Sequence, residues 1–245
     1  MLEKEFSSAD YVLHQAALPS VQRSVIDPIT TNRNNLDGTL NVLIAARDCG
    51  VKRVVFASSS AIYGDAIDMP LKETTIAKPL SPYAVTKLAG EHYCRIFQEV
   101  YGLETVSLRY FNVFGPGQDP RSEYGAVIPK FIKAVNMGKQ PVVYGDGEQT
   151  RDFVYVGDVV RANILACEAP NASGRAINIA RGKGVSLNQL LDTLRAVASA
   201  RINPIYANPR SGDIRDSLAD ISLAKETMGF EPKVDMEMGL RAMMA

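Results

Sequence analysis

Short apolar runs of strand type alternate with amphipathic helical patterns through the first half of the chain. In order, these are a strand run at residues 10–17, a helical pattern at 36–50, a strand run at 52–60, a helical pattern from residue 81 and a strand run from residue 103. This alternation is typical of a parallel sheet with helices on both faces. We therefore predict an α/β fold with a doubly wound parallel sheet for residues 1–117.

The alternation loosens after Gly117. We expect a helix at 128–138, a strand and turn at 141–156, a helix at 156–168, and then short segments rich in Pro, Gly and Asn. The methionine-rich end of the chain is either a last helix or a frayed tail. Residues 118–245 are predicted to form mainly a smaller α+β lobe that covers the carboxyl edge of the sheet, with some segments returning to the sheet.

The charges of the chain balance, because 27 Lys and Arg residues stand against 27 Asp and Glu residues in a total of 245. This balance gives no electrostatic basis for binding nucleic acid or an acidic membrane surface. No apolar run reaches the roughly 18 residues of a membrane span. Cys49, Cys94 and Cys167 include no CxxC pair, which argues against a disulfide framework and a zinc site. We expect a cytoplasmic globular protein without a metal.

Candidate chemistry lies in the stretch SPYAVTKLAGEHY, residues 81–93. Ser81 is a favourable N-cap and Pro82 a favourable first helical residue, so Tyr83 lies in the first turn of a helix. Lys87 follows four residues later and shares its face of the helix. An ammonium group and a helix N-terminus both favour a phenolate, which could accept a proton from a substrate alcohol. A YxxxK pair alone is more often a chance arrangement than a catalytic one.

Three serines, at positions 58–60, stand where a predicted buried strand ends. Ligands of doubly wound sheets bind at the carboxyl ends of the strands. We therefore expect these hydroxyl groups to lie close to Tyr83.

The chain as a whole resembles a known superfamily. Seven segments carry the resemblance in this order: HQAALPSV, NNLDGTLNVLIAA, VKRVVFASSSAIYGD, PLSPYAVTKLAGE, LRYFNVFGPGQ, TRDFVYVGDV and RSGDIRDSLADIS. They resemble the extended short-chain dehydrogenase/reductases, in particular the NAD-dependent sugar-nucleotide epimerases of the UDP-glucose and UDP-N-acetylglucosamine 4-epimerase type. The resemblance implies a Rossmann-like dinucleotide-binding domain and a lobe that binds a UDP-sugar.

The resemblance also implies residue roles. Tyr83 would be the catalytic base, Lys87 would bind the nicotinamide ribose and lower the pKa of the tyrosine, and Ser59 would be the catalytic hydroxyl group. The remaining cofactor contacts would be Ala16, Ala17, Asn35, Ser58 and Tyr110. The substrate contacts would be Ser60, Asn112, Arg151, Arg210, Asp213 and Ser217.

Several of these residues also have simpler interpretations. Asn35 could be a helix N-cap, with or without a cofactor contact. Tyr110 and Asn112 could be ordinary residues at a strand end. Arg151 next to Asp152 could be a surface ion pair.

The resemblance narrows the reaction. Dehydratases of this superfamily place an Asp-Glu pair after the catalytic hydroxyl group, and this chain has Ser60 and Ala61 there. Epimerisation through a 4-keto sugar is therefore favoured over elimination of water. The small side chain of Ser217 matches a position that leaves room for a 2-acetamido group, so N-acetylhexosamines are expected substrates beside hexoses.

One motif of the resembled family does not occur. The chain has no GxxGxxG before Tyr11, and we expect about 60 residues of two βα units to be missing. A truncated, non-catalytic chain that retains only a sugar-nucleotide-binding lobe is therefore an alternative, as is another oxidoreductase or decarboxylase of the superfamily. A homodimer through the YxxxK helix is also expected, with the apolar residues Leu88, Cys94, Ile96 and Phe97 available for it.

Overall fold

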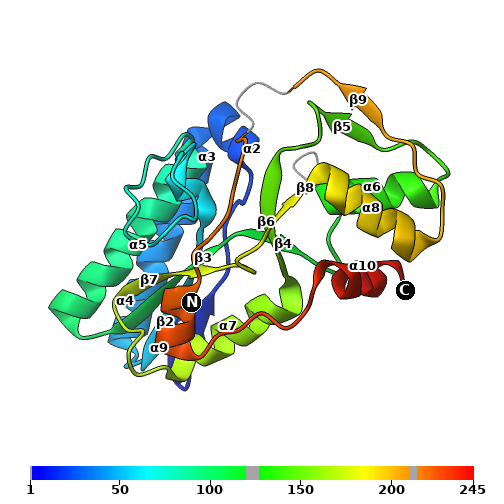
Figure 1. The fold of residues 1–245 in the computed structure, drawn as a ribbon. Coiled ribbons are helices and arrows are strands. Elements are labelled where there is room, and N and C mark those ends of the chain that lie inside the picture. Colours follow the sequence, from blue (N-terminus) through cyan, green and yellow to red (C-terminus); the bar gives the residue numbers. More distant parts are fainter. Residues whose placement is uncertain (1, 120–126, 210–213) are drawn as a thin grey trace.

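The computed structural model describes residues 2–119, 127–209 and 214–245. Its main sheet consists of four parallel strands in the order β1-β2-β3-β7 (Figure 1). These strands are β1 (Tyr11–His14), β2 (Arg53–Ser59), β3 (Glu104–Tyr110) and β7 (Arg175–Ile179). The predicted parallel α/β fold is confirmed.

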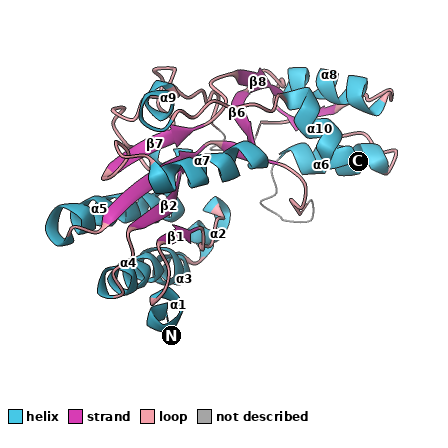
Figure 2. Cartoon of the chain, turned by 90° about the horizontal axis from the view of Figure 1, so that it is seen from below, coloured by secondary structure: helices cyan, strands magenta, loops and turns pink. Residues whose placement is uncertain are grey.

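Helices cover both faces of this sheet, as Figure 2 shows from below. One face packs against α4 (Gly38–Asp48) and α5 (Pro82–Tyr101), and the other against α7 (Val156–Glu168) and α9 (Ser222–Met228). β2 is buried from Arg53 to Ser58, since both of its faces are covered. A strand that is covered on both faces has a continuous run of apolar residues in its sequence, and residues 54–57, VVFA, are such a run.

Helix α5 has well-defined ends. The Ser81 side chain accepts a hydrogen bond from the Ala84 N–H at 3.2 Å, and Pro82 is the first helical residue. Gly102 ends the helix with a φ of 72°, a left-handed conformation that glycine adopts without steric cost. The predicted N-cap is therefore confirmed, and it fixes Tyr83 in the first turn.

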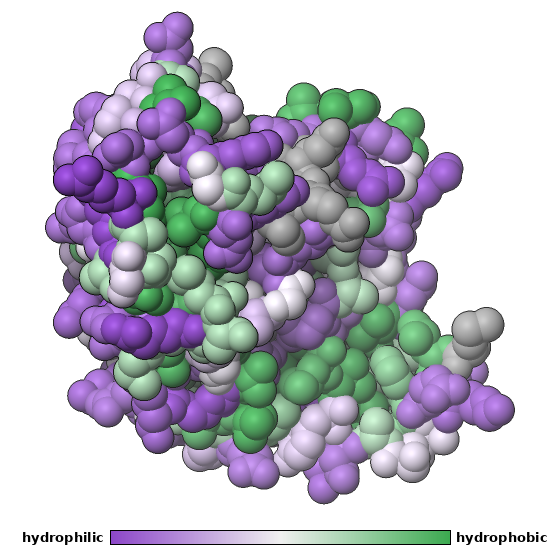
Figure 3. Space-filling model, turned by 90° about the vertical axis from the view of Figure 1, so that its right-hand side faces the viewer, coloured by the Kyte–Doolittle hydropathy of each residue, from purple (hydrophilic) through white to green (hydrophobic). Residues whose placement is uncertain are grey.

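The second lobe contains two small sheets, β4-β6-β8 and β5-β9. Their strands are β4 (Asn112–Phe114), β5 (Val142–Tyr144), β6 (Thr150–Tyr155), β8 (Gly184–Ser186) and β9 (Ile205–Ala207). Helices α6 (Val127–Asn136), α8 (Leu187–Ala198) and α10 (Met236–Met244) pack here around a core that includes Phe114, Phe131 and Leu190. On the face of the molecule shown in Figure 3, hydrophilic residues border hydrophobic ones.

The structure departs from several expectations. The first strand is only four residues long, and the helix expected to start at residue 36 follows a π-helical turn at Arg33–Asp37. Three short helices were not predicted: α1 (Leu2–Phe6), α2 (Val21–Ile26) and α3 (Pro28–Asn32). The stretch after residue 168, expected as short irregular segments, contains the 12-residue helix α8 with a capping box at Ser186 and Gln189. Of the two options for the methionine-rich end, the helix is correct.

Each helix in the described ranges is too short or too polar to span a lipid bilayer.

Candidate active site

A cavity of about 390 Å³ lies at the carboxyl edge of the main sheet, where the second lobe meets it. Parallel strands bring their carboxyl ends to one edge, so residues far apart in the sequence converge there. Seven of the predicted site residues line the cavity: Ser59, Ser60, Tyr83, Tyr110, Asn112, Arg151 and Ser217. Its apolar wall includes Pro19, Val21, Leu71 and Phe111.

Tyr83 and Ser59 form the polar centre of this cavity. Ser59 is the last residue of β2, and its hydroxyl group accepts a hydrogen bond from the Ala61 N–H at 3.2 Å. Tyr83 is 9% exposed, and burial raises the pKa of its phenol, while a hydrogen bond with Ser59 acts in the opposite direction. The two hydroxyl groups can therefore share one proton with an oxygen atom of a bound molecule.

Lys87 lies one helical turn after Tyr83 and is buried at 4% exposure. Its ammonium group donates a hydrogen bond to the Ala57 carbonyl at 2.8 Å and lies 5.0 Å from the centre of the Phe56 ring. Burial lowers the pKa of Lys87 to about 8. At neutral pH the group is still mostly protonated, so a positive charge lies beneath the cavity.

In this arrangement the Lys87 charge is not among the effects on the pKa of Tyr83, so the lowering of that pKa by Lys87 stays a prediction. The ammonium nitrogen is 5.8 Å from the centre of the Tyr83 ring and points to the Ala57 carbonyl. Desolvation of the phenol is the largest effect on Tyr83, and its direction is upward. The tyrosine is therefore protonated at neutral pH before a ligand enters.

Ser58 and Asn35 do not face the cavity. The Ser58 hydroxyl group donates to the carboxylate of Glu91 on α5. Asn35, 2% exposed, accepts from the Leu18 N–H at 2.7 Å and donates to the Leu18 carbonyl and to Thr86 Oγ1, each at 3.2 Å. The helix N-cap interpretation of Asn35 is wrong, because the residue lies inside the π-helical turn and its amide joins two chain segments.

Ala16 and Ala17 follow β1 at the same edge of the sheet, exposed and half-buried respectively. The Tyr110 hydroxyl group, which has one hydrogen to donate, lies within hydrogen-bond distance of two acceptors, Asn163 Oδ1 at 3.0 Å and Gln15 Oε1 at 3.2 Å. Burial raises the pKa of Tyr110. Tyr110 thus connects the sheet edge to α7, while its ring lines the cavity.

Arg151 belongs to β6 and reaches the cavity from the second lobe. Its Nη1 donates to the Thr150 carbonyl at 2.8 Å and to the Arg215 carbonyl at 3.3 Å. The alternative of a surface ion pair with Asp152 is wrong, because Asp152 is fully buried and accepts from the N–H groups of Arg181, Gly182 and Ala219. Arg210 and Asp213 lie outside the described residues.

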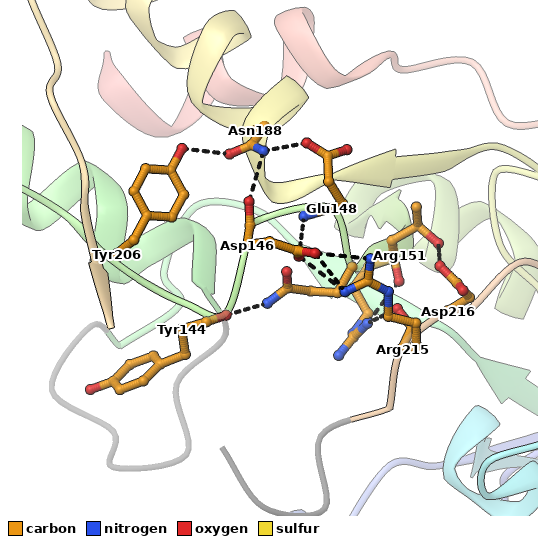
Figure 4. A network of polar contacts seen from close by, with 10 residues as sticks. Tyr144, Asp146, Glu148, Arg151, Asn188, Tyr206, Arg215 and Asp216 are labelled. Atoms are coloured by element: carbon orange, nitrogen blue, oxygen red, sulfur yellow. Dashed lines mark hydrogen bonds and ion pairs between the residues drawn. The ribbon is translucent and has the colours of Figure 1, made fainter. Parts of the chain in front are cut away.

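A second cavity, of about 490 Å³, adjoins the first and shares Ile214 with it. Its walls include the aromatic residues Tyr144 and Tyr206 from the paired strands β5 and β9. The polar contacts around it are drawn in Figure 4. Arg215 binds Asp146 through three contacts of 3.0–3.2 Å, and Asn188 accepts from the Tyr206 hydroxyl group at 2.9 Å.

Sequence reasoning missed this second cavity. The YGDGEQ turn offered a partial signal, since two glycines around Asp146 mark a tight turn, and Gly145 and Gly147 have φ values of 84° and 80°. The pairing of β5 with β9, which completes the cavity, joins distant parts of the sequence.

The site contains donors that suit a nicotinamide nucleotide. The Lys87 ammonium group has three N–H donors but makes only one hydrogen bond to the residues that the structure describes. Buried donors without partners are costly, so the hydroxyl groups of a ribose would satisfy them. No group of three or more His, Cys, Asp or Glu residues in the described ranges could hold a metal ion.

Comparison with known proteins places this site in a family. The family model described as "NAD dependent epimerase/dehydratase family" matches residues 1–180. The chain belongs to this family.

Solved structures and curated relatives agree with this assignment. The UDP-N-acetylglucosamine 4-epimerase of Methanobrevibacter ruminantium M1, solved with UDP-N-acetylmuramic acid, is 48% identical with a TM-score of 0.96, over 99% of this chain and 78% of that one. The UDP-glucuronic acid 4-epimerase of Bacillus cereus, solved with UDP-glucuronic acid and NAD, is 32% identical with a TM-score of 0.90, over 99% and 76%.

A UDP-glucose 4-epimerase of Mycolicibacterium smegmatis is 37% identical over 232 residues, which are 94% of this chain and 74% of the relative. Together these findings confirm the predicted family, the Rossmann-like fold class, NAD as the cofactor and the enzyme class of NAD-dependent epimerase.

Proposed function

We propose that this protein interconverts the C4 epimers of a UDP-hexose or UDP-N-acetylhexosamine through a 4-keto sugar. The observation that carries the proposal is the convergence of Ser59 and Tyr83 on one cavity, above the buried ammonium group of Lys87. The same reaction is supported by the family and by its relatives, which include a UDP-N-acetylglucosamine 4-epimerase and a UDP-glucose 4-epimerase.

The residues of the cavity account for the proton transfer. Tyr83 accepts the proton of the sugar 4-hydroxyl group, and Ser59 hydrogen bonds to the same oxygen and orients it. NAD, when bound, supplies the hydride acceptor and donor. Lys87, which makes one hydrogen bond to the described residues, would hold the nicotinamide ribose with its remaining N–H donors, and its ammonium charge would favour the Tyr83 phenolate. After the 4-keto sugar rotates and presents its other face, Tyr83 returns the proton to the C4 oxygen.

The two adjoining cavities divide the substrate between them. The hexose occupies the cavity of Ser59 and Tyr83, and the uracil base occupies the second cavity, between Tyr144 and Tyr206. Arg151 lies where the diphosphate would pass, and guanidinium groups bind phosphate oxygens through paired hydrogen bonds. Arg210 and Asp213 remain proposed contacts to the diphosphate and the nucleotide ribose, by resemblance.

Ser217 sets the proposed sugar range. Its side chain is short, and the residue lines the sugar cavity together with Leu71 and Asn112. A small side chain at this wall leaves space for a 2-acetamido group. We expect S217Y to retain activity on UDP-hexoses and to lose it on UDP-N-acetylhexosamines.

The outer face of α5 supports a homodimer. Val85, Tyr93, Ile96 and Val100 are exposed large apolar residues that share one side of the helix. Of the residues first expected at this interface, Cys94 and Phe97 are buried in the core and cannot take part, while Ile96 is exposed. Light scattering of the wild type and of I96E would test the assembly. The three free cysteines are compatible with the proposed cytoplasmic location.

The test of the proposed function starts with the purified protein. NAD released by denaturation is quantified per chain, and the native protein, with and without added NAD, is incubated with UDP-galactose and with UDP-N-acetylgalactosamine. Formation of the C4 epimer with no net change in NADH supports the proposal. Net accumulation of NADH would instead indicate an oxidoreductase, and no turnover a non-catalytic chain. In a parallel incubation with UDP-glucuronic acid, loss of carbon dioxide would indicate a decarboxylase.

A further inference from the structure

Glu91 extends the catalytic face of α5 by one more turn. Tyr83, Lys87 and Glu91 are spaced by four residues each, so they lie along one side of the helix. All three are buried, at 9%, 4% and 7% exposure. A carboxylate at such depth requires several hydrogen-bond donors to offset the loss of water.

Two strands supply these donors. Arg109 of β3 donates from Nε to Glu91 Oε1 at 3.0 Å and from Nη2 to Glu91 Oε2 at 2.8 Å. Ser58 of β2 donates its hydroxyl hydrogen to Glu91 Oε1. The ion pair is almost inaccessible, with side chains 9% and 6% exposed. Glu91 is therefore held by both strands on which α5 packs.

The pairing of β2 with β3 connects this cluster to the cavity. Ser58 lies opposite Arg109 in the ladder, and the next pair is Ser59 opposite Tyr110. Successive side chains of a strand point to opposite faces. Ser58 and Arg109 thus face α5, while Ser59 and Tyr110, one residue later on each strand, line the cavity.

A further contact extends the cluster to the turn after β2. Arg109 Nη1 donates to the Tyr63 hydroxyl group at 2.8 Å, and Tyr63 in turn donates to Asn178 Oδ1 of β7 at 2.7 Å. The turn Ser60–Tyr63 follows Ser59 directly. Arg109 is therefore connected to Ser58 through Glu91 and to Tyr63 directly, on either side of Ser59 in the sequence.

We propose that Glu91 is a positioning residue, which through Arg109 and Ser58 fixes the Tyr83 turn of α5 against Ser59 at the end of β2. Its carboxylate does not reach the cavity, so it acts only through these contacts. Two experiments test this role. A kinetic experiment rests on the proposed epimerase function, whereas a titration of Tyr83 does not.

The kinetic experiment compares E91Q with E104Q. Glu104 of β3 and Arg53 of β2 form another arginine–glutamate pair, at the start of these strands and away from the cavity, so E104Q is the control. A small displacement of reacting groups is costly, so we expect E91Q to lower kcat roughly 10- to 100-fold with KM within about twofold. E104Q should leave both constants within about twofold of wild type. An E91Q enzyme with wild-type kcat, or an equal loss in E104Q, would overturn the proposal.

The titration experiment reads the Tyr83–Ser59 contact without turnover. Ionisation of Tyr83 is isolated by ultraviolet difference spectra against matching Y83F variants. Because the Ser59 hydrogen bond lowers the pKa of Tyr83, S59A should raise that pKa in the wild-type and E104Q backgrounds. In E91Q the effect of S59A should shrink or vanish. A full S59A effect in E91Q would show that the contact does not depend on Glu91 and would refute the proposal.

Two further outcomes are informative. If E91Q does not fold, S58A replaces it, because S58A removes only the hydroxyl group that donates to Glu91 and leaves the Arg109–Glu91 ion pair intact. The change in kcat and the effect of S59A on the pKa of Tyr83 are then measured in S58A. If the wild type does not epimerise any UDP-sugar, the proposed function fails, while the titration still tests the role of Glu91.

Discussion

Two arginine–carboxylate pairs, one beneath helix α5 and one beside the second cavity, differ in their surroundings. Arg109 and Glu91 lie between α5 and the main sheet with side chains 9% and 6% exposed. Arg215 and Asp146 lie beside the second cavity with side chains 62% and 56% exposed. Both are multiply hydrogen bonded, but water screens only the second.

The difference indicates what each pair can contribute. A buried pair with every oxygen occupied defines one geometry, because any other arrangement leaves a charge without partners. An exposed pair can exchange its partner for water at little cost, so a charged ligand can displace it. The buried pair therefore helps to hold the catalytic groups at the sheet edge in one geometry. The exposed pair in the second lobe can instead rearrange when a substrate binds or leaves.

The largest expected effect is on the chemistry at the sheet edge. Y83F should lower kcat by about 10²- to 10⁴-fold, because phenylalanine has no hydroxyl group whose phenolate could accept the substrate proton. Initial-rate kinetics on the C4 epimers would measure this. Y101F, at the other end of α5, should stay close to wild type, and equal losses in both variants would mean that α5 as a whole, rather than the phenol, was disturbed.

Breaking the buried pair should destabilise the fold. R109M leaves the Glu91 carboxylate buried without its cation, and we expect a loss of about 3–5 kcal/mol in the free energy of unfolding. Urea denaturation followed by circular dichroism would measure it. A loss below about 1 kcal/mol would mean that this pair behaves like an exposed one.

His14 is buried in the half of the molecule that contains the main sheet, and its titration should make the stability of the protein sensitive to acid. Burial, followed by the charge of Lys87, lowers the pKa of His14 from 6.5 to about 4. Below pH 6.5 the unfolded chain gains a proton that the folded chain does not, so stability falls as the pH drops from 6.5 to about 4.

This His14 contribution amounts to about 3 kcal/mol at most. Gln at this position could keep the hydrogen bond to Thr39, which is 2.9 Å long, without titrating. Urea denaturation of wild type and H14Q at several pH values should therefore show a smaller acid-dependent loss in H14Q. Parallel pH profiles would show that His14 is not the source.

A smaller effect is expected where the second lobe holds the substrate. R151Q removes a guanidinium group from the proposed diphosphate path, and we expect KM to rise roughly 10- to 100-fold with little change in kcat. Kinetics at saturating and subsaturating UDP-sugar would separate the two. A fall in kcat alone would place Arg151 in the chemical step instead.

The smallest effect should come from the exposed pair. D146N should leave the melting temperature within about 2 °C of the wild type, because solvent-exposed pairs contribute little to folding. Differential scanning calorimetry would measure this. A drop similar to that of R109M would remove the contrast between the two pairs.

Much of the sheet and of the cavity could be predicted from the sequence. Continuous apolar runs and the Ser81 cap located β2 and α5, and the rule that strands present ligands at their carboxyl ends placed Ser59 and Tyr83 together. The resemblance extended this to Asn112, Arg151 and Ser217, which the structure brings to the same cavity.

The errors have identifiable causes. Ser58 was assigned to the cofactor although its neighbour Ser59 was assigned to the cavity, and the alternation along a strand allows only one of the two to face it. Desolvation, the largest effect on the pKa of Tyr83, depends on packing that the sequence does not reveal. The second cavity depends on the long-range pairing of β5 with β9.

The continuous burial of β2 has a consequence for how this strand finds its partner. When both faces are apolar, sliding by one residue exposes no hydrophobic group to water, so hydrophobicity alone does not select the alignment. Polar residues mark both ends of the ladder instead: Arg53 opposite Glu104 at the start and Ser58 opposite Arg109 at the end. A slip of one position would bring Ser59 toward Glu91 and turn Ser58 away from it. The Arg53–Glu104 ion pair at one end, and the contact of Ser58 with the Arg109–Glu91 pair at the other, thus favour a single register. Polar contacts, rather than hydrophobicity, therefore direct Ser59 to the cavity.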